Sequence, residues 1–196
     1  TADNGPEGYA YKRDETFDHW SAEPFRGLKR DIYEGGHHVP FIIKWPGVTE
    51  AGSTCDKLVS QIDFMSTIAS SLGYELPDNA AEDSHDLFPL LHGRSKTPRT
   101  VHVHNTRADA WAIRVGEWNL IAGKSGYHSG RRKPWEEKRN YPADDDDSVE
   151  LYHYAKDISQ RNNLAKKFPK KVAELQKELK NARERGFTAP RLIVSQ

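Results

Sequence analysis

Apolar residues gather into only a few stretches of this chain, and the first of them predicts a strand. The run "VPFIIKW" (39–45) is rich in residues that strands favour and is stopped by Pro46 and Gly47. Such a run, bounded by turn residues, predicts a buried strand. Residues 1–36 before it show little regular pattern and many turn formers, which favours a long functional loop.

A helical pattern follows the predicted strand. Met65, Ile68 and Leu72 recur at helical spacing within "DFMSTIASSLG" (63–73). The aspartate that opens this stretch can cap a helix, and the glycine that closes it can end one. A loop rich in Asp, Asn, Pro and Gly (74–99) comes next and predicts a seam between two subdomains.

Beyond the loop, short β-rich runs precede one amphipathic helix. The helix is predicted from Pro169 to about Arg185, because proline at its start and Gly186 after its end fit helix punctuation. We expect the helix to cover one face of a small antiparallel meander formed by the short runs. The runs are "TVHVH" (100–104), "AWAIRVG" (110–116), "WNLIAG" (118–123) and "VELYHY" (149–154). The apolar face of the helix consists of Val172, Leu175, Leu179 and Ala182.

The composition limits the classes of function. The 196 residues are 36% apolar and 30% charged, and the 29 basic residues balance the 29 acidic ones. The net charge of zero gives no field that would favour nucleic acid or an anionic membrane. No apolar run approaches the roughly 20 residues that span a bilayer, and no signal peptide is visible. Cys55 is the only cysteine, so an internal disulfide is excluded.

The amino-terminal "TADNG" places two oxygen-bearing side chains on one predicted turn. Asp3 and Asn4 are hard ligands of the kind that calcium prefers, and Gly5 permits a tight turn. Such a turn normally follows a buried strand, and none precedes it here. Two interpretations stay open: a flexible end without a role, or a chain cut from something longer.

A second candidate is the basic, glycine-containing stretch "FRGLKRDIYEGG" (25–36). Lys29 lies between Arg26 and Arg30 and precedes the pair Gly35-Gly36. A lysine in such a loop can bring a positive charge close to an oxyanion, because glycine permits a close approach of the backbone. The plainer interpretation is an exposed basic loop.

Three further patterns in the sequence are weaker indications of a site. Four aspartates at 144–147 could bind calcium, but the spacing of an EF-hand is absent and a solvated loop is favoured. His102 and His104 alternate on a predicted strand and could bind zinc or contact a substrate, although no third zinc ligand is identifiable. The stretch "AGKSG" (122–126) lacks the first glycine of a phosphate-binding loop.

Six motifs occur in order along the chain. They are "TADNG", "FRGLKRDIYEGGHHVPFIIKWPG", "VSQIDFMSTIASSLG", "AEDSHDLFPLLHG", "AIRVGEWNLI" and "LYHYAKDISQRNNLA". Together they resemble the C-terminal part of formylglycine-dependent sulfatases, from residue 1 to about 165. The resemblance implies an alkaline-phosphatase-like α/β domain, of which residues 1–95 would be the C-terminal part. Residues 96–196 would form a smaller subdomain with an antiparallel sheet and a C-terminal helix.

The resemblance also implies a site. In this family the Asp-Asn pair binds a calcium ion, which here assigns Asp3 and Asn4 as metal ligands. The lysine of the "FRG-x-K" stretch contacts the sulfate, which assigns Lys29 a catalytic role. His104 lies on a strand of the domain that edges the family's pocket and is a candidate substrate contact. Calcium and lysine would offset the charge of the sulfate ester as a nucleophile arrives.

The chain departs from the family at the nucleophile. Formylglycine is made in a Cys/Ser-x-Pro-x-Arg motif, whereas Cys55 is followed by Lys57 at the proline position and Val59 at the arginine position. The formylglycine and the remaining calcium ligands would therefore lie in an N-terminal part outside this chain, and the chain alone is expected to be inactive. A second departure is His38, where the family has arginine.

Two functional hypotheses follow. The first is a segment of a sulfatase, a hydrolase of sulfuric esters whose partners would be a sulfated small molecule or glycan and the remaining N-terminal part. A phosphonate or phosphodiester hydrolase is its variant within the superfamily. The second is a non-catalytic module that binds sulfated glycans or a partner protein. The resemblance favours an exported location, whether periplasmic, secreted or lysosomal.

Overall fold

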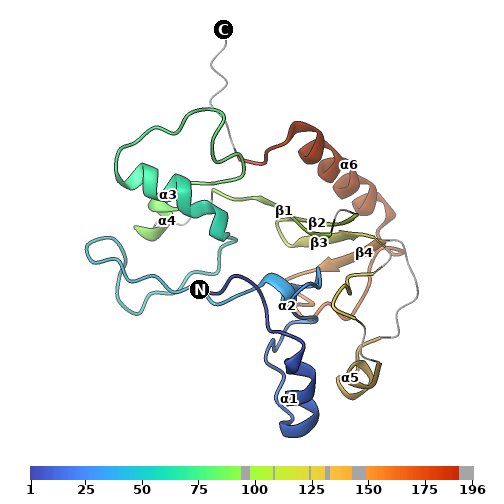
Figure 1. Ribbon diagram of the computed structural model, residues 1–196. Helices are drawn as coiled ribbons and strands as arrows, with labels where there is room; N and C mark the ends of the chain where they lie inside the picture. Colours follow the sequence, from blue (N-terminus) through green and yellow to red (C-terminus); the bar gives the residue numbers. More distant parts are fainter. Residues whose placement is uncertain (94–97, 108, 124, 131–132, 143–148, 190–196) are drawn as a thin grey trace. The chain divides into compact units, whose positions relative to one another are not determined.

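The chain forms two compact units, each assembled from two separate segments. The structure is a computed structural model that describes residues 1–93, 98–107, 109–123, 125–130, 133–142 and 149–189 (Figure 1). Unit 1 consists of Thr1–Phe41 and Val103–Leu179, and unit 2 consists of Ile42–His102 and Lys180–Gln196. The family-based division between residues 95 and 96 stays a prediction.

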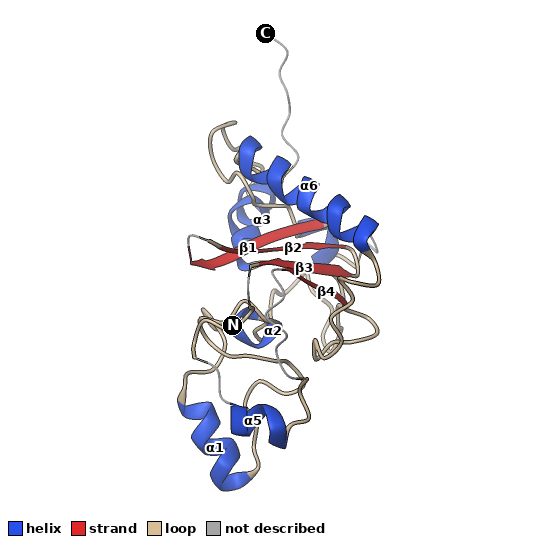
Figure 2. Cartoon of the chain, turned by 90° about the vertical axis from the view of Figure 1, so that its right-hand side faces the viewer, coloured by secondary structure: helices blue, strands red, loops and turns tan. Residues whose placement is uncertain are grey.

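A four-stranded sheet in the order β1-β2-β3-β4 dominates unit 1 (Figure 2). Strand β2 pairs antiparallel with β3, and β3 pairs antiparallel with β4. The register places Leu120 of β3 opposite both Ile113 and Leu151, and all three side chains are buried. The meander predicted from short β-rich runs is confirmed. The strands are β1 (Val101–Arg107), β2 (Ala110–Val115), β3 (Trp118–Ala122) and β4 (Val149–His153).

Helices lie on both faces of this sheet. The predicted C-terminal helix is α6 (Pro169–Arg185), which runs along one face in Figures 1 and 2. Leu175 and Leu179 of its apolar side are buried, as the helical spacing predicts. The short helix α2 (Glu34–His37) lies on the other face. Ile32 and Tyr33 just before α2 join a buried cluster with sheet residues, which holds this loop against the sheet.

The amino-terminal region is more regular than the loop predicted for residues 1–36. It contains α1 (Tyr9–Phe17) as well as α2, so the prediction of one long loop is wrong. Tyr11 of α1 packs with Trp20 and with Trp135 of α5 (Lys133–Lys138), and the two indole rings are 4.4 Å apart. Aromatic burial of this kind stabilises a helix that has little apolar periodicity of its own.

Unit 2 contains the helix predicted after residue 63. A 3₁₀ turn, Gln61–Asp63, leads into α3 (Phe64–Ser71), and α4 (Phe88–Leu91) packs against α3. Gly73 has a φ of +65°, which glycine adopts readily beyond the end of a helix. The existence and the end of the helix are therefore confirmed, but its predicted apolar face is exposed to solvent.

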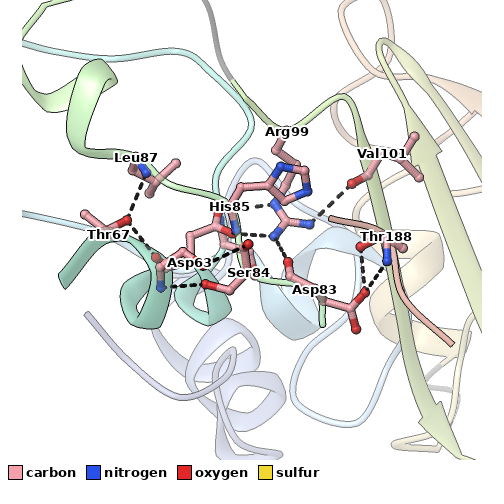
Figure 3. A network of polar contacts seen from close by, with 11 residues as sticks. Asp63, Thr67, Asp83, Ser84, His85, Leu87, Arg99, Val101 and Thr188 are labelled. Atoms are coloured by element: carbon pink, nitrogen blue, oxygen red, sulfur yellow. Dashed lines mark hydrogen bonds and ion pairs between the residues drawn. The ribbon is translucent and has the colours of Figure 1, made fainter. Parts of the chain in front are cut away.

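A buried polar network explains why α3 exposes its apolar face (Figure 3). Asp63 is fully buried and forms an ion pair with buried Arg99, which approaches it through Nε and Nη2. Thr67, one turn later, donates to the carbonyl of Asp63 at 2.6 Å and accepts from the backbone N–H of Leu87 at 2.9 Å. Since these polar groups need partners inside the fold, they turn the helix and leave the apolar side chains outside.

The predicted strand at residues 39–45 is not a strand in the structure. Its backbone forms neither a helix nor a strand. The side chains of Pro40, Ile42 and Lys44 are exposed, and those of the residues between them are half-buried. The alternation has the period of a strand, but a strand also requires a neighbouring strand for its hydrogen bonds. The prediction was wrong because an apolar run specifies the pattern of side chains and not the partner.

Candidate functional site

The amino-terminal turn, residues 3–5, lies directly against the stretch 25–36 that carries Lys29. This stretch is called the lysine loop below. The backbone N–H of Gly5 donates to the carbonyl of Gly36 at 2.8 Å, and the N–H of Lys29 donates to the carbonyl of Pro6 at 2.9 Å. Asp3 is exposed and Asn4 is half-buried at the start of this turn. Two segments more than twenty residues apart in sequence are thus fixed to each other by their backbones within unit 1.

Glycines allow this close approach. A Cβ atom on Gly5 would lie 1.8 Å from the carbonyl oxygen of Gly35, and one on Gly36 would lie 2.1 Å from that of Asp31. A Cβ atom on Gly35 would lie 2.2 Å from the carbonyl oxygen of Gly27. No side chain fits at these distances, so the three glycines are required by backbone packing. The paired glycines of the "YEGG" stretch therefore connect the turn to the lysine loop.

Lys29 is held by a carboxylate that sequence reasoning missed. Its Nζ lies 2.7 Å from Oε1 of Glu7, and Nη1 of Arg30 lies 3.5 Å from Oε2 of the same residue. The hydrogen bond from Lys29 lowers the pKa of Glu7. The Lys29 side chain is 32% exposed, and Glu7 orients its ammonium.

The rest of the loop is anchored to the unit 1 core. Asp31 is buried and accepts hydrogen bonds from the backbone N–H groups of Leu28, His128 and Ser129. Burial raises the pKa of Asp31 despite these bonds. Arg26 is also buried, and its guanidinium lies 4.2 Å from the centre of the Tyr33 ring. Anchors on both sides of Lys29 restrict the positions that its backbone can adopt.

A buried carboxylate, Glu34, lies under the same loop. It accepts from Nδ1 of His38 at 2.9 Å and from Nδ2 of Asn119 at 3.3 Å. Burial would raise its pKa, but the hydrogen bond from His38 and the nearby imidazoles lower the pKa to about 2. Nδ1 of His38 also lies 3.1 Å from the hydroxyl of Tyr154, just beyond β4. His38 therefore connects Glu34 to Tyr154, the residue that follows strand β4.

His104 and His37 share one acceptor. Each points Nε2 at the carbonyl oxygen of Ile32, at 3.2 Å and 3.3 Å, and their rings lie 4.0 Å apart. Burial lowers the pKa of His37. Nε2 of His104 is thus oriented toward the loop before α2. Its role as a substrate contact stays a prediction.

The zinc alternative receives no support from the described part of the chain. Among those residues, no group of three or more His, Cys, Asp or Glu side chains could hold a metal ion. The aspartates at 144–147 lie outside the described residues. Cys55 is exposed and has a free thiol. No helix in the described ranges is long and apolar enough to cross a membrane.

Asp3 and Asn4 fit part of a calcium site. Both side chains carry hard oxygen donors, and the turn that bears them is held in place by the Gly5–Gly36 hydrogen bond. Calcium takes about six to eight oxygen ligands, so two residues supply a minority of the shell. The donor chemistry is compatible with a divalent cation whose other ligands come from elsewhere.

The site predicted from the sequence did not include Glu7 or Glu34. Glu7 lies only a few residues after Asn4, but no spacing rule connects it with Lys29. Glu34 is flanked by "GGHH", and an i,i+4 pairing with His38 is the one local signal that could have identified it.

Comparisons with known proteins identify relatives of this chain. Residues 1–74 match the family model described as sulfatase. An N-acetylgalactosamine-6-O-sulfatase from Bacteroides thetaiotaomicron is 31% identical over 94% of this chain and 36% of its own length. Human arylsulfatase A is 39% identical over 50% of this chain and 18% of its own length.

Solved structures with a similar fold include proteins of the same kind as these relatives. A Bacteroides thetaiotaomicron structure described under the metabolism of multiple glycosaminoglycans superposes with a TM-score of 0.72 at 27% identity. The superposition covers 92% of this chain and 37% of that one. A sulfatase from Pseudoalteromonas, with a TM-score of 0.65 and 21% identity over 92% of this chain and 35% of its own, shares the fold. The chain thus spans about a third of the length of the relatives that align with nearly all of it.

Proposed function

This chain belongs to the sulfatase family, and on that premise we propose that the protein carrying it hydrolyses sulfate esters. Lys29 would contact the sulfate, and Asp3 and Asn4 would supply oxygen ligands to a calcium ion. The observation that carries the proposal is the backbone contact that holds the turn at residues 3–5 against the lysine loop. The sequence similarity to an N-acetylgalactosamine-6-O-sulfatase over 94% of the chain supports it.

The chemistry requires positive charge near a poorly electrophilic anion. The Lys29 ammonium would hydrogen-bond a sulfuryl oxygen and stabilise negative charge as it develops there. Glu7 would hold this ammonium in place before the ester arrives, since it already pairs with Lys29 at 2.7 Å. A bound calcium ion would supply Lewis-acid stabilisation of the same anion.

The nucleophile in this proposal is a formylglycine from a part of the protein outside this chain. Within the 196 residues, Cys55 stands in "CDKLV", which lacks the proline and arginine of the modification motif. The chain alone is therefore expected to bind a sulfate ester without turning it over.

We propose a sulfated sugar as the substrate class. A relative that aligns over 94% of this chain is named N-acetylgalactosamine-6-O-sulfatase, whereas arylsulfatase A aligns over 50% of it. His104 is proposed to line the substrate site from strand β1. An exported location, where sulfated polysaccharides occur, accords with this substrate class.

The test replaces Lys29 in the full polypeptide encoded by the gene. Lys29→Ala should lower kcat/KM for an N-acetylgalactosamine-6-sulfate substrate by about 100-fold or more, the size of effect seen when one charge-stabilising donor is removed. Lys12→Ala is the matched control, because Lys12 is an exposed lysine of unit 1 on α1. Unchanged kcat/KM for Lys29→Ala would contradict the proposal.

The second hypothesis, a non-catalytic module for sulfated glycans or a partner protein, is favoured by the missing nucleophile motif and by the basic sequence Arg131-Arg132-Lys133. It predicts salt-sensitive binding of sulfated polymers by the full polypeptide with no release of inorganic sulfate. The phosphonate or phosphodiester variant would be recognised by release of phosphate or phosphonate from the matching ester. The same assay, run with each ester, separates these outcomes.

A further inference from the structure

Residues 28–31 form a tight turn that carries Lys29. The N–H of Asp31 donates to the carbonyl of Leu28 at 2.8 Å, and the N–H of Leu28 donates to Oδ2 of Asp31 at 2.9 Å. Arg30, between Lys29 and Asp31, has a φ of +81°. A residue other than glycine keeps this left-handed conformation only where its surroundings hold it. The backbone beside Lys29 is therefore strained and needs contacts from outside the 28–31 turn.

A segment between β3 and β4, residues 125–130, supplies most of these contacts. The N–H groups of His128 and Ser129 each donate to Oδ1 of Asp31 at 2.8 Å. The Ser129 hydroxyl donates to Oδ2 of Asp31 at 2.8 Å. With the bond from Leu28, four donors hold this one carboxylate. Asp31 thus joins the 28–31 turn to a segment that lies 97 residues later in the sequence.

The 125–130 segment is itself fixed to the core of unit 1. The N–H of Ile32 donates to the carbonyl of Gly126 at 2.8 Å, and the N–H of Gly126 donates to buried Glu150 at 2.9 Å. A Cβ atom on Gly126 would lie 2.4 Å from the ring of Tyr33, so glycine alone fits there. Because Glu150 belongs to β4, the sheet holds the segment that binds Asp31.

The 28–31 turn connects this buried anchor to the ammonium of Lys29. Asp31 is buried on the core side of the turn, whereas the side chain of Lys29 reaches Oε1 of Glu7 at 2.7 Å. Strand β1 adds one further bond, from the Thr106 hydroxyl to the carbonyl of Arg30 at 2.6 Å. Loss of the anchor would let the strained turn relax and would displace the backbone of Lys29.

We propose that Asp31 is a positioning residue for the reaction, through which the 125–130 segment holds Lys29 in place for the sulfuryl oxygen. The inference rests on the proposed function, since it takes Lys29 as the contact of the sulfate. Asp31 acts through the turn and does not touch the substrate. A donor stabilises developing charge only within a narrow range of distances, so a small displacement of Lys29 lowers the rate.

The test is the steady-state kinetics of the full polypeptide with an N-acetylgalactosamine-6-sulfate substrate. Asp31→Asn keeps the size of the side chain and replaces one acceptor oxygen by an amide that donates. We expect kcat to fall by about 10- to 100-fold with little change in KM, because a misplaced donor costs mainly transition-state stabilisation. In a Lys29→Ala background, Asp31→Asn should have no further effect on kcat/KM, because the ammonium that it positions is already absent.

A loss of the same size in both backgrounds would overturn the proposal, because Asp31 would then act independently of Lys29. Ser129→Ala gives the same test with a smaller disturbance, since it removes one donor and leaves the backbone bonds to Asp31. It should lower kcat by about 2- to 10-fold, the range expected for one hydrogen bond. Ser129→Thr, which keeps the hydroxyl, should restore the rate.

Asp157→Asn is the matched control. Asp157 is another carboxylate of unit 1 that accepts backbone N–H groups, and its bonds go to Arg161 and Asn162, outside the lysine loop. Its replacement should lower the melting temperature and leave kcat unchanged. A fall in kcat equal to that of Asp31→Asn would assign both effects to general loss of stability and would overturn the proposal.

Amide hydrogen exchange of residues 26–33 separates this proposal from the proposed function. Exchange there should accelerate by about 10-fold or more in Asp31→Asn and stay unchanged in Asp157→Asn. Accelerated exchange in a polypeptide that releases no sulfate would remove the proposed function and keep Asp31 as the residue that holds the turn. Sulfate release with unchanged kcat in Asp31→Asn would overturn the positioning role and leave the proposed function standing.

Discussion

Gly5, Gly35 and Gly36 occupy positions where a single added carbon has no room. The carbonyl oxygen of Gly35 lies 1.8 Å from the place of a Cβ on Gly5, so Gly5→Ala must separate the turn from the loop. Overpacking of this kind costs about 1–3 kcal/mol in the free energy of unfolding. Urea denaturation of Gly5→Ala should show this loss.

Gly8→Ala is the matched control for that substitution. Gly8 has a φ of −52° and no heavy atom within 4 Å of an added Cβ. Its free energy of unfolding should stay within about 0.5 kcal/mol of the parent. Equal losses for the two alanine variants would contradict the role assigned to the packed glycines.

Glu34 should give the protein an acid-sensitive contribution to stability. Burial acts to raise its pKa, but the hydrogen bond from His38 and the nearby imidazoles together lower the pKa from 4.5 to about 2 in the folded state. A depressed pKa adds stability above the unfolded pKa and loses it as the pH falls through the folded value. The contribution, about 3 kcal/mol at most, should therefore disappear between about pH 4.5 and pH 2.

The measurement is the free energy of unfolding as a function of pH for Glu34→Gln. The variant should be less stable than the parent at pH 7, and the difference should shrink as the pH falls toward 2. Glu15→Gln, at an exposed position of α1, should leave the pH profile unchanged. A parallel loss at every pH would show that Glu34 acts through packing and not through its charge.

At the scale of elements, the Asp63–Arg99 ion pair decides how α3 is oriented. Asp63→Asn would leave the guanidinium of fully buried Arg99 without its counter-charge. Removing one member of a buried pair costs about 3–5 kcal/mol. Thermal or urea unfolding of Asp63→Asn should show this loss, and amide exchange should accelerate along Phe64–Ser71.

An exposed ion pair of the same unit provides the comparison. Asp56 pairs with Lys57 at 2.8 Å, and its side chain is fully accessible at the surface. Asp56→Asn should leave the free energy of unfolding nearly unchanged, because solvent screens an exposed pair. A similarly small effect for Asp63→Asn would show that the network around Arg99 does not hold the helix.

The elements also show which parts of the fold local patterns specify. The spacing between Asp63 and Gly73 predicted α3 and its end, because helix periodicity and termination are local properties. The face that α3 buries depends on Arg99, 36 residues later, and no helical pattern contains that partner. The apolar run at 39–45 likewise predicted a strand, whereas pairing depends on residues that a local pattern does not include.

For the whole molecule, the sheet and α6 followed from local patterns of apolar residues and helix-ending residues, and the site did not. Asp3, Asn4 and Lys29 were assigned from the resemblance to sulfatases, and the structure brings the turn and the lysine loop together through backbone hydrogen bonds. Glu7 was not predicted, since its contact with Lys29 arises only when the two segments meet. Long-range contacts between charged side chains leave no periodic trace in a sequence.

The discontinuity of unit 1 has a consequence for the order in which the protein is made. The ribosome releases residues 1–41 well before Val103–Leu179, which contain the strands that bury Ile32 and Tyr33. During synthesis, the turn and the lysine loop therefore cannot pack against the sheet until the strands of Val103–Leu179 have emerged. Synthesis that pauses between residues 42 and 102 would leave the loop that carries Lys29 accessible to proteases and chaperones at that stage.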